Sequence, residues 1–321
     1  MSERDDSNGA DPLRDLFAHV RPRATPPPAD EVEIRSALFA EWDALTRRRV
    51  RVGRFAAAAA AAVVVAGIAA LLLKTGTAPA AVVASVERVR GNVEVGGVAL
   101  AIGSRIPTAA RIDTHNGQVA LRLESGGSLR LAPQTALTFG GPGVATLDAG
   151  AVYFDSEDAA AASRVEVRTA LGTLRDVGTQ FVARLVGDRL EVGVRDGRVA
   201  IARAAGPIDV APGERVSVAT GTGAPRREAI ATFGADWDWA ERLAPPFAID
   251  GRALIDVLHW VESQTGRTLV FEDAASEQVA RDSILSGSVD LEPLQKLAAV
   301  LAANDLDYSL DGERIVIRTM K

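Results

Sequence analysis

The most extensive pattern in the chain is an alternation of apolar and polar residues between positions 82 and 220. Residues 119–123 and 190–194, for example, each place three apolar side chains at every second position. A period of two is typical of strands with one buried face, and glycines punctuate these runs where turns are expected. The pattern predicts an all-β domain over 82–220 with no helix of any length. Its architecture is solenoid- or sandwich-like, or a barrel, since periodicity does not distinguish them.

An uncharged apolar run at residues 55–73 precedes this region. Its 19 residues would reach about 28 Å as a helix, close to the hydrocarbon thickness of a bilayer. Five arginines lie just before it and only Lys74 marks its far end. Because cationic loops stay in the cytoplasm, the run predicts a single-span membrane protein with residues 1–54 inside. Its many alanines leave a buried helix of a soluble protein open, and a signal peptide cleaved after Ala80 is a third reading.

Residues 1–54 are predicted to form a helical cytoplasmic arm with two short amphipathic helices. A proline-rich stretch, residues 22–28, separates the helices as a stiff linker. The apolar stripes of the two helices are Leu13, Leu16, Phe17, Ile34, Leu38, Phe39, Trp42 and Leu45. Helices of this size bury little surface by themselves, so their stripes need a partner. The membrane surface, the other helix, or a groove on a soluble cytoplasmic protein would each serve.

Residues 246–321 alternate between strand and helix patterns. Strands are predicted at 247–249, 268–271, 283–289, 308–310 and 314–317, and helices at 252–264 and from an Asp290 cap onward. This order predicts a small α+β domain with a core of its own. Residues 221–245, which contain Trp237 and Trp239, are predicted to be a linker between this domain and the β domain.

Composition narrows the range of chemistry. The 321 residues carry a net charge of −6, which gives no reason to expect nucleic-acid binding. The absence of cysteine excludes disulfides, thiol catalysis and cysteine-based zinc sites. His19, His115 and His259 lie in three separate regions, so no metal pair or catalytic dyad is visible. We therefore predict that the protein is not an enzyme and has no cofactor and no metal site.

The acidic residues Asp155, Glu157 and Asp158 are the nearest approach to a cation site in the sequence. No loop with the ligand spacing of a calcium site surrounds them. We therefore interpret them as a solvated turn.

The family resemblance rests on an ordered series of motifs. Residues 165–181 read Val-Glu-Val-Arg-Thr-Ala-Leu-Gly-Thr-Leu-Arg-Asp-Val-Gly-Thr-Gln-Phe. They resemble the signature of FecR-type proteins, which are single-span anti-sigma regulators of cell-surface signalling in Gram-negative bacteria. Residues 191–199 resemble the strand-turn-strand that follows in that family, and residues 210–215 resemble its proline-glycine-glutamate turn. The resemblance implies a β-solenoid-like domain outside the cytoplasm.

The C-terminal region resembles a second family, the short N-terminal domain of secretins and TonB-dependent receptors. Residues 266–271 (Gly-Arg-Thr-Leu-Val-Phe) and 294–297 (Leu-Gln-Lys-Leu), followed by Tyr308, carry this similarity. In FecR-type proteins such a module is implied to meet the signalling domain of an outer-membrane TonB-dependent receptor.

These resemblances imply a transmembrane anti-sigma factor in the inner membrane, with its N-terminus cytoplasmic and its C-terminus periplasmic. Its partners would be a cytoplasmic sigma factor, a TonB-dependent receptor and the membrane, with no direct nucleic acid and no small-molecule substrate. The alternative is a cell-envelope adaptor or scaffold without a sigma partner. The arm separates the two hypotheses, because a tethered adaptor has no use for apolar stripes with a tryptophan.

The Gly178-Thr179 bond is the one candidate for chemistry. A hydroxyl that follows glycine can attack the preceding carbonyl in an N-to-O acyl shift. Some members of the resembled family split themselves at a glycine-threonine bond in this domain. A turn glycine followed by a β-branched strand residue explains the pair without any reaction, and we favour that interpretation.

Overall fold

The computed structural model of the chain describes residues 80–157, 165–176, 178–221 and 223–320, together with Ser36 and Ala40. The chain divides into two compact units, Met1–Ala78 and Pro79–Lys321. The predicted span at 55–73 and the eight stripe residues of the arm lie outside the described residues. Within the described ranges, no helix combines the length and the apolar character needed to cross a bilayer.

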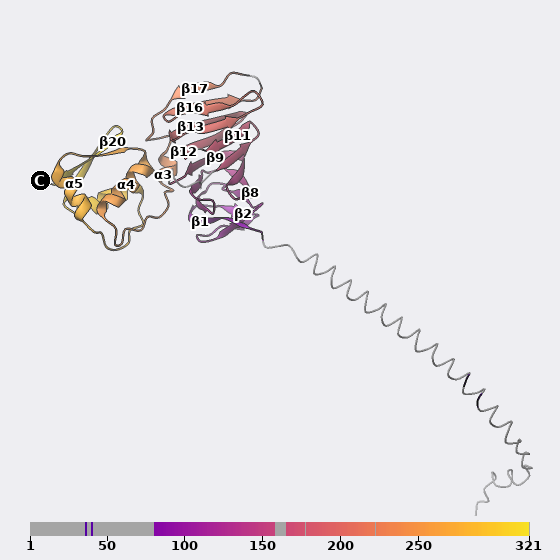
Figure 1. The fold of residues 1–321 in the computed structure, drawn as a ribbon, viewed down its shortest axis with the longest axis horizontal. Helices are drawn as coiled ribbons and strands as arrows, with labels where there is room; N and C mark the ends of the chain where they lie inside the picture. The colour runs from indigo at the N-terminus through magenta and orange to yellow at the C-terminus, as the bar shows by residue number, and fades with distance from the viewer. Residues whose placement is uncertain are drawn as a thin grey trace, which may run out of the picture. The chain divides into compact units, whose positions relative to one another are not determined.

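The alternating region forms two β-sheets (Figure 1). The first sheet contains, in spatial order, β4 (Arg105–Pro107), β1 (Val82–Arg90), β6 (Gln118–Leu123), β7 (Ser128–Leu131), β9 (Val144–Asp155), β12 (Gln180–Val186), β13 (Arg189–Asp196), β16 (Glu214–Ala219) and β17 (Arg226–Ala229). The second sheet contains β3 (Val98–Ala99), β2 (Glu94–Val95), β5 (Arg111–Asp113), β8 (Ala136–Gly141), β9, β10 (Glu166–Thr169), β11 (Gly172–Asp176), β14 (Val199–Ala202) and β15 (Ile208–Val210).

Strand β9 belongs to both sheets. Its first half pairs with β8 and β10, and its second half pairs with β7 and β12. The change of sheet occurs at Gly150, where φ is +84°. A Cβ at this position would lie 2.4 Å from the Thr135 hydroxyl oxygen, so both the backbone angle and the close approach require glycine.

One hydrophobic core lies between the two sheets. It takes Val119, Leu121 and Leu123 from β6, together with residues such as Ile112 and Leu137 from the second sheet. These side chains occupy the inward positions of the predicted alternation. The described residues of 82–218 contain no helix. The all-β prediction is therefore confirmed, and the architecture is a two-sheet sandwich between whose layers the chain passes repeatedly.

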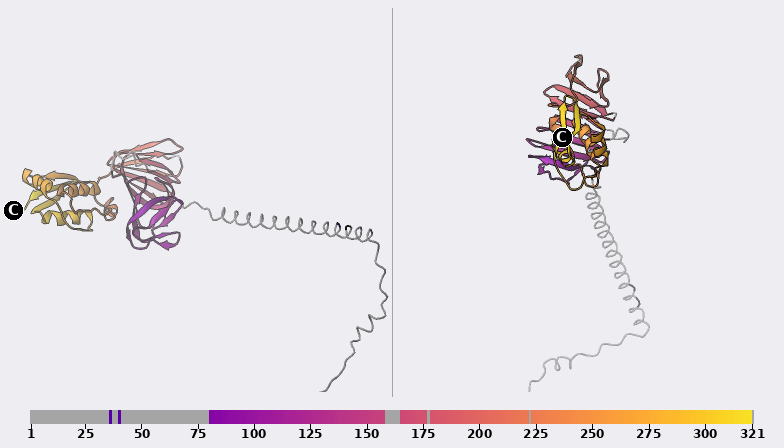
Figure 2. Two further views of the ribbon diagram at one scale, coloured as in Figure 1. Left: turned by 60° about the horizontal axis from the view of Figure 1, so that its bottom comes forward. Right: turned by 90° about the vertical axis from the view of Figure 1, so that its left-hand side faces the viewer.

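Residues 246–320, here called the C-terminal module, have a separate core and an α+β fold. Its elements are α4 (Leu254–Thr265), β18 (Thr268–Phe271), α5 (Ala274–Asp282), α6 (Pro293–Ala302), β19 (Leu306–Asp311) and β20 (Arg314–Thr319). The strands form one sheet in the order β18-β20-β19, and the helices and the sheet share a core that includes Leu258, Leu297 and Ile315. Figure 2 shows the backbone of this module, in orange and yellow, from two further sides.

Three details of the C-terminal module differ from the prediction. Residues 247–249 and 283–289 are not strands; a single bridge joins Ala253 to Ile284. The carbonyls of Phe247 and Val289 instead accept hydrogen bonds from Lys296 Nζ, both at 2.8 Å. Helix α5 was not predicted, and the N-cap of α6 is Glu292 rather than Asp290. A lysine that satisfies these two carbonyls replaces part of a strand ladder here.

The segment predicted as a linker, 221–245, contains regular structure. Its β17 pairs with β16, and a short helix, α3 (Asp238–Glu241), follows. Trp237 is only 1 % exposed and packs against Tyr153 of β9. Its indole nitrogen donates to the Ala231 carbonyl at 2.9 Å. Because one large aromatic side chain is buried on the sheet, the segment packs as part of the β domain.

Candidate functional site: the junction of the β domain and the C-terminal module

A row of residues crosses the outer face of the first sheet. Arg130 on β7 lies opposite Tyr153 on β9, and Tyr153 lies opposite Val182 on β12. Alternation predicts that this face meets solvent, because Leu129 and Phe154, their neighbours in sequence, point into the core. Arg130 and Tyr153 are nevertheless fully buried. Another part of the chain therefore covers the outer face of the sheet.

The cover consists of α3 and the C-terminal end of α4. Arg130 donates to the Ala240 carbonyl at 2.8 Å and to the side-chain oxygen of Gln264. Arg195 on β13 donates to the Gln264 carbonyl and to Glu241 Oε1, both at 2.8 Å. The last carbonyls of a helix lack partners within the helix and carry partial negative charge. Arg195 therefore binds the carbonyl end of α4, while Arg130 binds the side chain of the same Gln264 and a carbonyl of α3.

We call this group of contacts the junction. It consists of Arg130, Tyr153, Asp155, Arg195, Trp237, Glu241 and Gln264.

Aromatic rings lie beneath both guanidinium groups of the junction. The Arg130 guanidinium lies 4.8 Å from the centre of the Tyr153 ring, and that of Arg195 lies 4.6 Å from the centre of a Trp237 ring. The two aromatic side chains meet edge to face, with centroids 6.2 Å apart and planes at 81°. Contacts between a desolvated cation and a ring face are favourable. They help to offset the cost of removing two arginines from water.

Two carboxylates balance the charges of the two arginines. Asp155 Oδ2 lies 3.6 Å from Arg130 and accepts from Gln264 Nε2 at 3.2 Å. Glu241 pairs with Arg195. Arg130 Nε, Arg195 Nε and Tyr153 Oη are buried without a hydrogen-bond partner among the described residues. The network is neutral in total, but it is not saturated with hydrogen bonds.

Burial shifts the ionisation of the junction. It lowers the pKa of Arg130 and raises the pKa of Tyr153. It also raises the pKa of the Glu241 carboxyl above its ordinary value of 4.5, and the charge of Arg195 opposes that rise. Each direction is the one expected when an ionised form loses water.

Gly266 ends α4 at the junction. Its φ is +63°, and its N–H bonds to the Glu262 carbonyl as a left-handed C-cap. A Cβ here would lie 2.2 Å from the Thr232 carbonyl and 2.8 Å from Arg195 Nε. Glycine thus both stops the helix and lets it approach the β domain.

A second contact joins the C-terminal module to β1, and we call it the β1 contact. Arg88 lies 2.5 Å from Asp290, and its Nε donates to the Ala244 carbonyl at 3.2 Å. Arg90 lies 3.1 Å from Glu292. Arg88 and Arg90 stand two residues apart on one strand, so they reach the same side of the sheet.

The Gly178-Thr179 bond lies beside the junction. Thr179 is 1 % exposed, and its carbonyl accepts from the Ser156 N–H at 3.1 Å. The next residue, Gln180, donates from Nε2 to the Ser263 carbonyl on α4 at 3.0 Å. Gly178 has φ of +68°. This geometry fits a turn glycine followed by a strand residue, which is the interpretation without self-cleavage.

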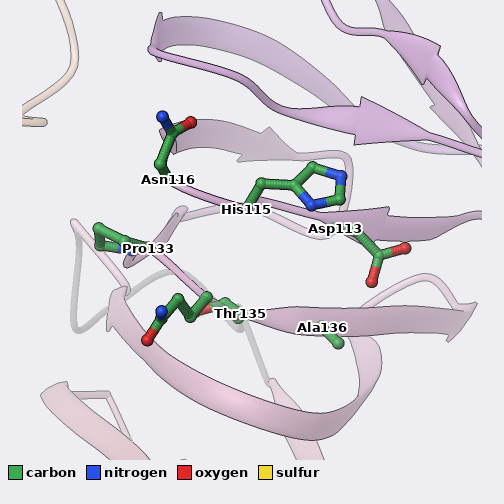
Figure 3. A pocket seen from close by; sticks show the side chains of 7 residues that line it. Asp113, His115, Asn116, Pro133, Thr135 and Ala136 are labelled. Carbon is green, nitrogen blue, oxygen red and sulfur yellow. The ribbon is translucent and has the colours of Figure 1, made fainter.

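A hollow on the β domain is a separate feature. Its volume is about 560 Å³, and Asp113, His115, Asn116, Pro133, Thr135 and Ala136 line it (Figure 3). His115 Nε2 lies 3.4 Å from Glu94 Oε2. His259 is exposed on α4. The described residues contain no group of three or more side chains that would hold a metal ion.

The structure corrects one prediction and adds residues that the sequence did not single out. Asp155 is 1 % exposed, so it does not belong to a solvated turn. Its carboxylate accepts from the Glu157 N–H at 2.9 Å and belongs to the junction. The sequence offered no signal for the junction, because Arg130 and Arg195 stand at outward strand positions where polar residues are expected. Only their burial in the fold shows that this face is covered.

Comparisons with known proteins give a family match for the central part of the chain. The family described as FecR protein matches residues 110–200. No curated protein matches the chain significantly. Two crystal structures of a "putative anti-sigma factor" from Parabacteroides distasonis ATCC 8503 are similar. One has 18 % identity and a TM-score of 0.34, covering 65 % of this chain and 97 % of that one. The other has 17 % identity and a TM-score of 0.35, covering 66 % and 99 %.

TM-scores of 0.34 and 0.35 are too low to support a conclusion about fold or partner. The family match does support a conclusion, because it includes the whole signature at 165–181 and the motif at 191–199. The chain therefore carries a FecR-type domain over residues 110–200, which confirms the resemblance that its motifs indicated.

Proposed function

We propose that the protein is a single-span anti-sigma regulator of the inner membrane. The observation that carries the proposal is the order of its parts. A FecR-type domain follows an uncharged run at 55–73 that has five arginines on one side only. That charge asymmetry favours a cytoplasmic N-terminus and a periplasmic FecR-type domain. A chain with this layout has one end in each compartment and can carry a signal between them.

The periplasmic partner in this proposal is the signalling domain of a TonB-dependent outer-membrane receptor. The C-terminal module supports the proposal, because its fold places helices on a small sheet and leaves β18 and β19 as sheet edges. An edge strand is a common docking element. Engagement of this module would be passed to the β domain through the junction and the β1 contact.

The cytoplasmic partner in this proposal is a sigma factor, held by the arm. Its binding surface would be the two apolar stripes, of which Leu38 and Trp42 are the central large members. Replacing both with glutamate should release the sigma factor, because two charges cannot enter an apolar groove without a large desolvation cost. We expect transcripts that depend on the sigma factor to rise without any external signal, and quantitative transcript analysis measures this.

A matched control uses the same helix. Ala40 is helical and exposed, so Ala40→Glu adds a charge without touching the stripe. It should leave the transcripts at their basal level. If Leu38→Glu with Trp42→Glu also leaves them unchanged, the sigma-binding role is wrong and the adaptor alternative gains support.

The membrane topology has its own test. Protease added to intact spheroplasts should degrade residues 80–321 and leave an N-terminal fragment that contains the arm. Protection of the β domain would contradict the proposed localisation.

The Gly178-Thr179 bond should stay intact in the mature protein. We expect intact-mass measurement to give one chain of 33.6 kDa, because Gly178 and Thr179 fit a turn and a strand entry without any reaction. Two co-purifying fragments that meet at this bond would contradict the expectation and would establish self-cleavage. Thr179→Val is the control, because it keeps the shape of the side chain and removes the hydroxyl.

A further inference from the structure

We propose that Asp290, Leu291 and Glu292 form a docking loop for a basic protein surface, and that Arg88 and Arg90 of β1 occupy this loop until a partner displaces them. The identity of that partner as a receptor domain rests on the proposed function. The competition itself is argued from contacts within the described part of the chain.

The docking loop has the form of a recognition segment. It carries two carboxylates that flank Leu291, whose side chain is 37 % exposed although it is large and apolar. The loop directly precedes α6, whose N-cap is Glu292. Lys296 on the first turns of α6 bonds to the Phe247 and Val289 carbonyls, which fixes the base of the loop. The loop is therefore held at its base by Lys296, while its two carboxylates pair with Arg88 and Arg90 of β1.

The β1 contact is much weaker than the junction. The Asp290 side chain is 65 % exposed and its partner Arg88 is 15 % exposed, while Arg90 and Glu292 are 40 % and 30 % exposed. Ion pairs at such exposure contribute little, and salt screens them. Arg130 and Asp155 of the junction are almost fully buried, and a buried pair is costly to break. A partner can therefore displace β1 from the docking loop while the end of α4 stays bound to the first sheet.

Charge determines which partner suits the docking loop. Residues 246–321 contain 13 Asp and Glu against 7 Lys and Arg, so this module alone accounts for an acidic excess as large as that of the whole chain. An acidic surface attracts a basic partner and repels an acidic one. Arg88 and Arg90 pair with Asp290 and Glu292, so guanidinium groups are one kind of basic group that binds the loop. The partner therefore presents at least two basic side chains around an apolar contact with Leu291.

The first test measures access to the docking loop in the full-length protein in detergent. The chain has no cysteine, so Leu291→Cys provides a single site for maleimide labelling. Arg88→Ala with Arg90→Ala should raise the labelling rate about fivefold, which two weak exposed pairs would supply. Leu310→Cys is the matched control: it replaces an exposed apolar side chain beside Asp311, and its rate should not change. An unchanged rate at Leu291→Cys overturns the proposal.

The second test asks whether a basic probe takes the place of β1. In the Arg88→Ala and Arg90→Ala background, a hexa-arginine peptide should return the labelling rate of Leu291→Cys to that of the closed protein. Asp290→Asn with Glu292→Gln should abolish this protection. Both replacements are nearly isosteric, and an unchanged melting temperature verifies the fold.

Two outcomes of the second test overturn the proposal. One is equal protection at Leu310→Cys, which would mean that the peptide follows overall charge rather than the loop. The other is protection that survives Asp290→Asn with Glu292→Gln. Neither test reads a transcript, so failure of the arm variants in the sigma assay would not be confused with failure of this proposal.

Discussion

Arg130 and Arg195 show how a single residue type can bind one part of a chain to another. Each stands at an outward position of a strand, and each donates to a backbone carbonyl of a helix. A lysine would not replace them equally well, because the planar guanidinium donates in two directions while its face lies on a ring. The junction therefore depends on the shape of the arginine side chain as well as on its charge.

Arg130→Met should destabilise the folded protein by about 3–5 kcal/mol, because Asp155 would then lie buried without its cation. The Ala240 carbonyl would lose its donor as well. Chemical denaturation of the full-length protein measures the change. Arg111→Ala is the control, since Arg111 is half exposed and its removal should cost less than about 1 kcal/mol. Equal losses in the two variants would contradict the account of the junction.

Glu241 makes stability depend on pH. Its pKa is raised in the folded state, so the folded protein holds this proton more tightly than the unfolded chain does. Stability should therefore fall as the pH rises from the ordinary value of 4.5 through the raised value. Glu241→Gln cannot ionise and should remove this decline, which unfolding free energies between pH 4 and pH 7 would reveal. Glu228→Gln, at an exposed position, should leave the decline in place.

At the scale of elements, the end of α4 is the point where the C-terminal module meets the β domain. Gly266→Ala would put a Cβ within 2.2 Å of the Thr232 carbonyl in addition to straining a left-handed backbone. Gly312→Ala isolates the backbone term, because Gly312 has φ of +56° and nothing lies within 4 Å of the added atom. We expect the Gly312 variant to lose about 1–2 kcal/mol and the Gly266 variant clearly more. Thermal unfolding compares the two, and similar losses would mean that the close approach is unimportant.

Elements with strong local patterns could be predicted from the sequence, and elements defined by long-range packing could not. β18 and the β19–β20 hairpin have apolar periodicity and a turn at Gly312, and both were predicted. Helix α5 was not predicted, because its buried side consists of Ser276 and Ala280, which give almost no apolar stripe. The strands expected near 247 and 285 lack a ladder, since Lys296 takes two of the carbonyls.

The candidate site was harder to predict than the fold. Its residues lie between positions 130 and 264 and meet only when α4 packs on the first sheet. No spacing of residues in the sequence indicates that these side chains come into contact in the fold. Arg130 and Arg195 occupy outward positions of their strands, where alternation leads one to expect polar residues, so neither they nor their partners on α3 and α4 stood out in the sequence.

At the scale of the whole molecule, the boundary of the β domain lies after the tryptophans. Trp237 and Ile230 cover Tyr153 and Val182 on the outer face of the first sheet. A chain ending at residue 220 would expose Tyr153 and Val182 to solvent, whereas a chain ending at residue 245 retains Trp237 and Ile230, which cover them. We expect the shorter chain to lose at least about 3 kcal/mol relative to the longer one, as for removal of a buried tryptophan. Denaturation of the two truncated proteins gives the comparison, and equal stability would restore the interpretation of 221–245 as a linker.

Strand β9 has a consequence for how relatives of this chain can diverge. Phe154 points into the core while Tyr153 and Asp155 point toward the junction on the outer face of the sheet. Inserting one residue after Gly150 would exchange these two sides at once. An odd-numbered insertion within β9 would therefore disrupt the core and the junction together, whereas an insertion in a turn would leave the two sides of the strand unchanged.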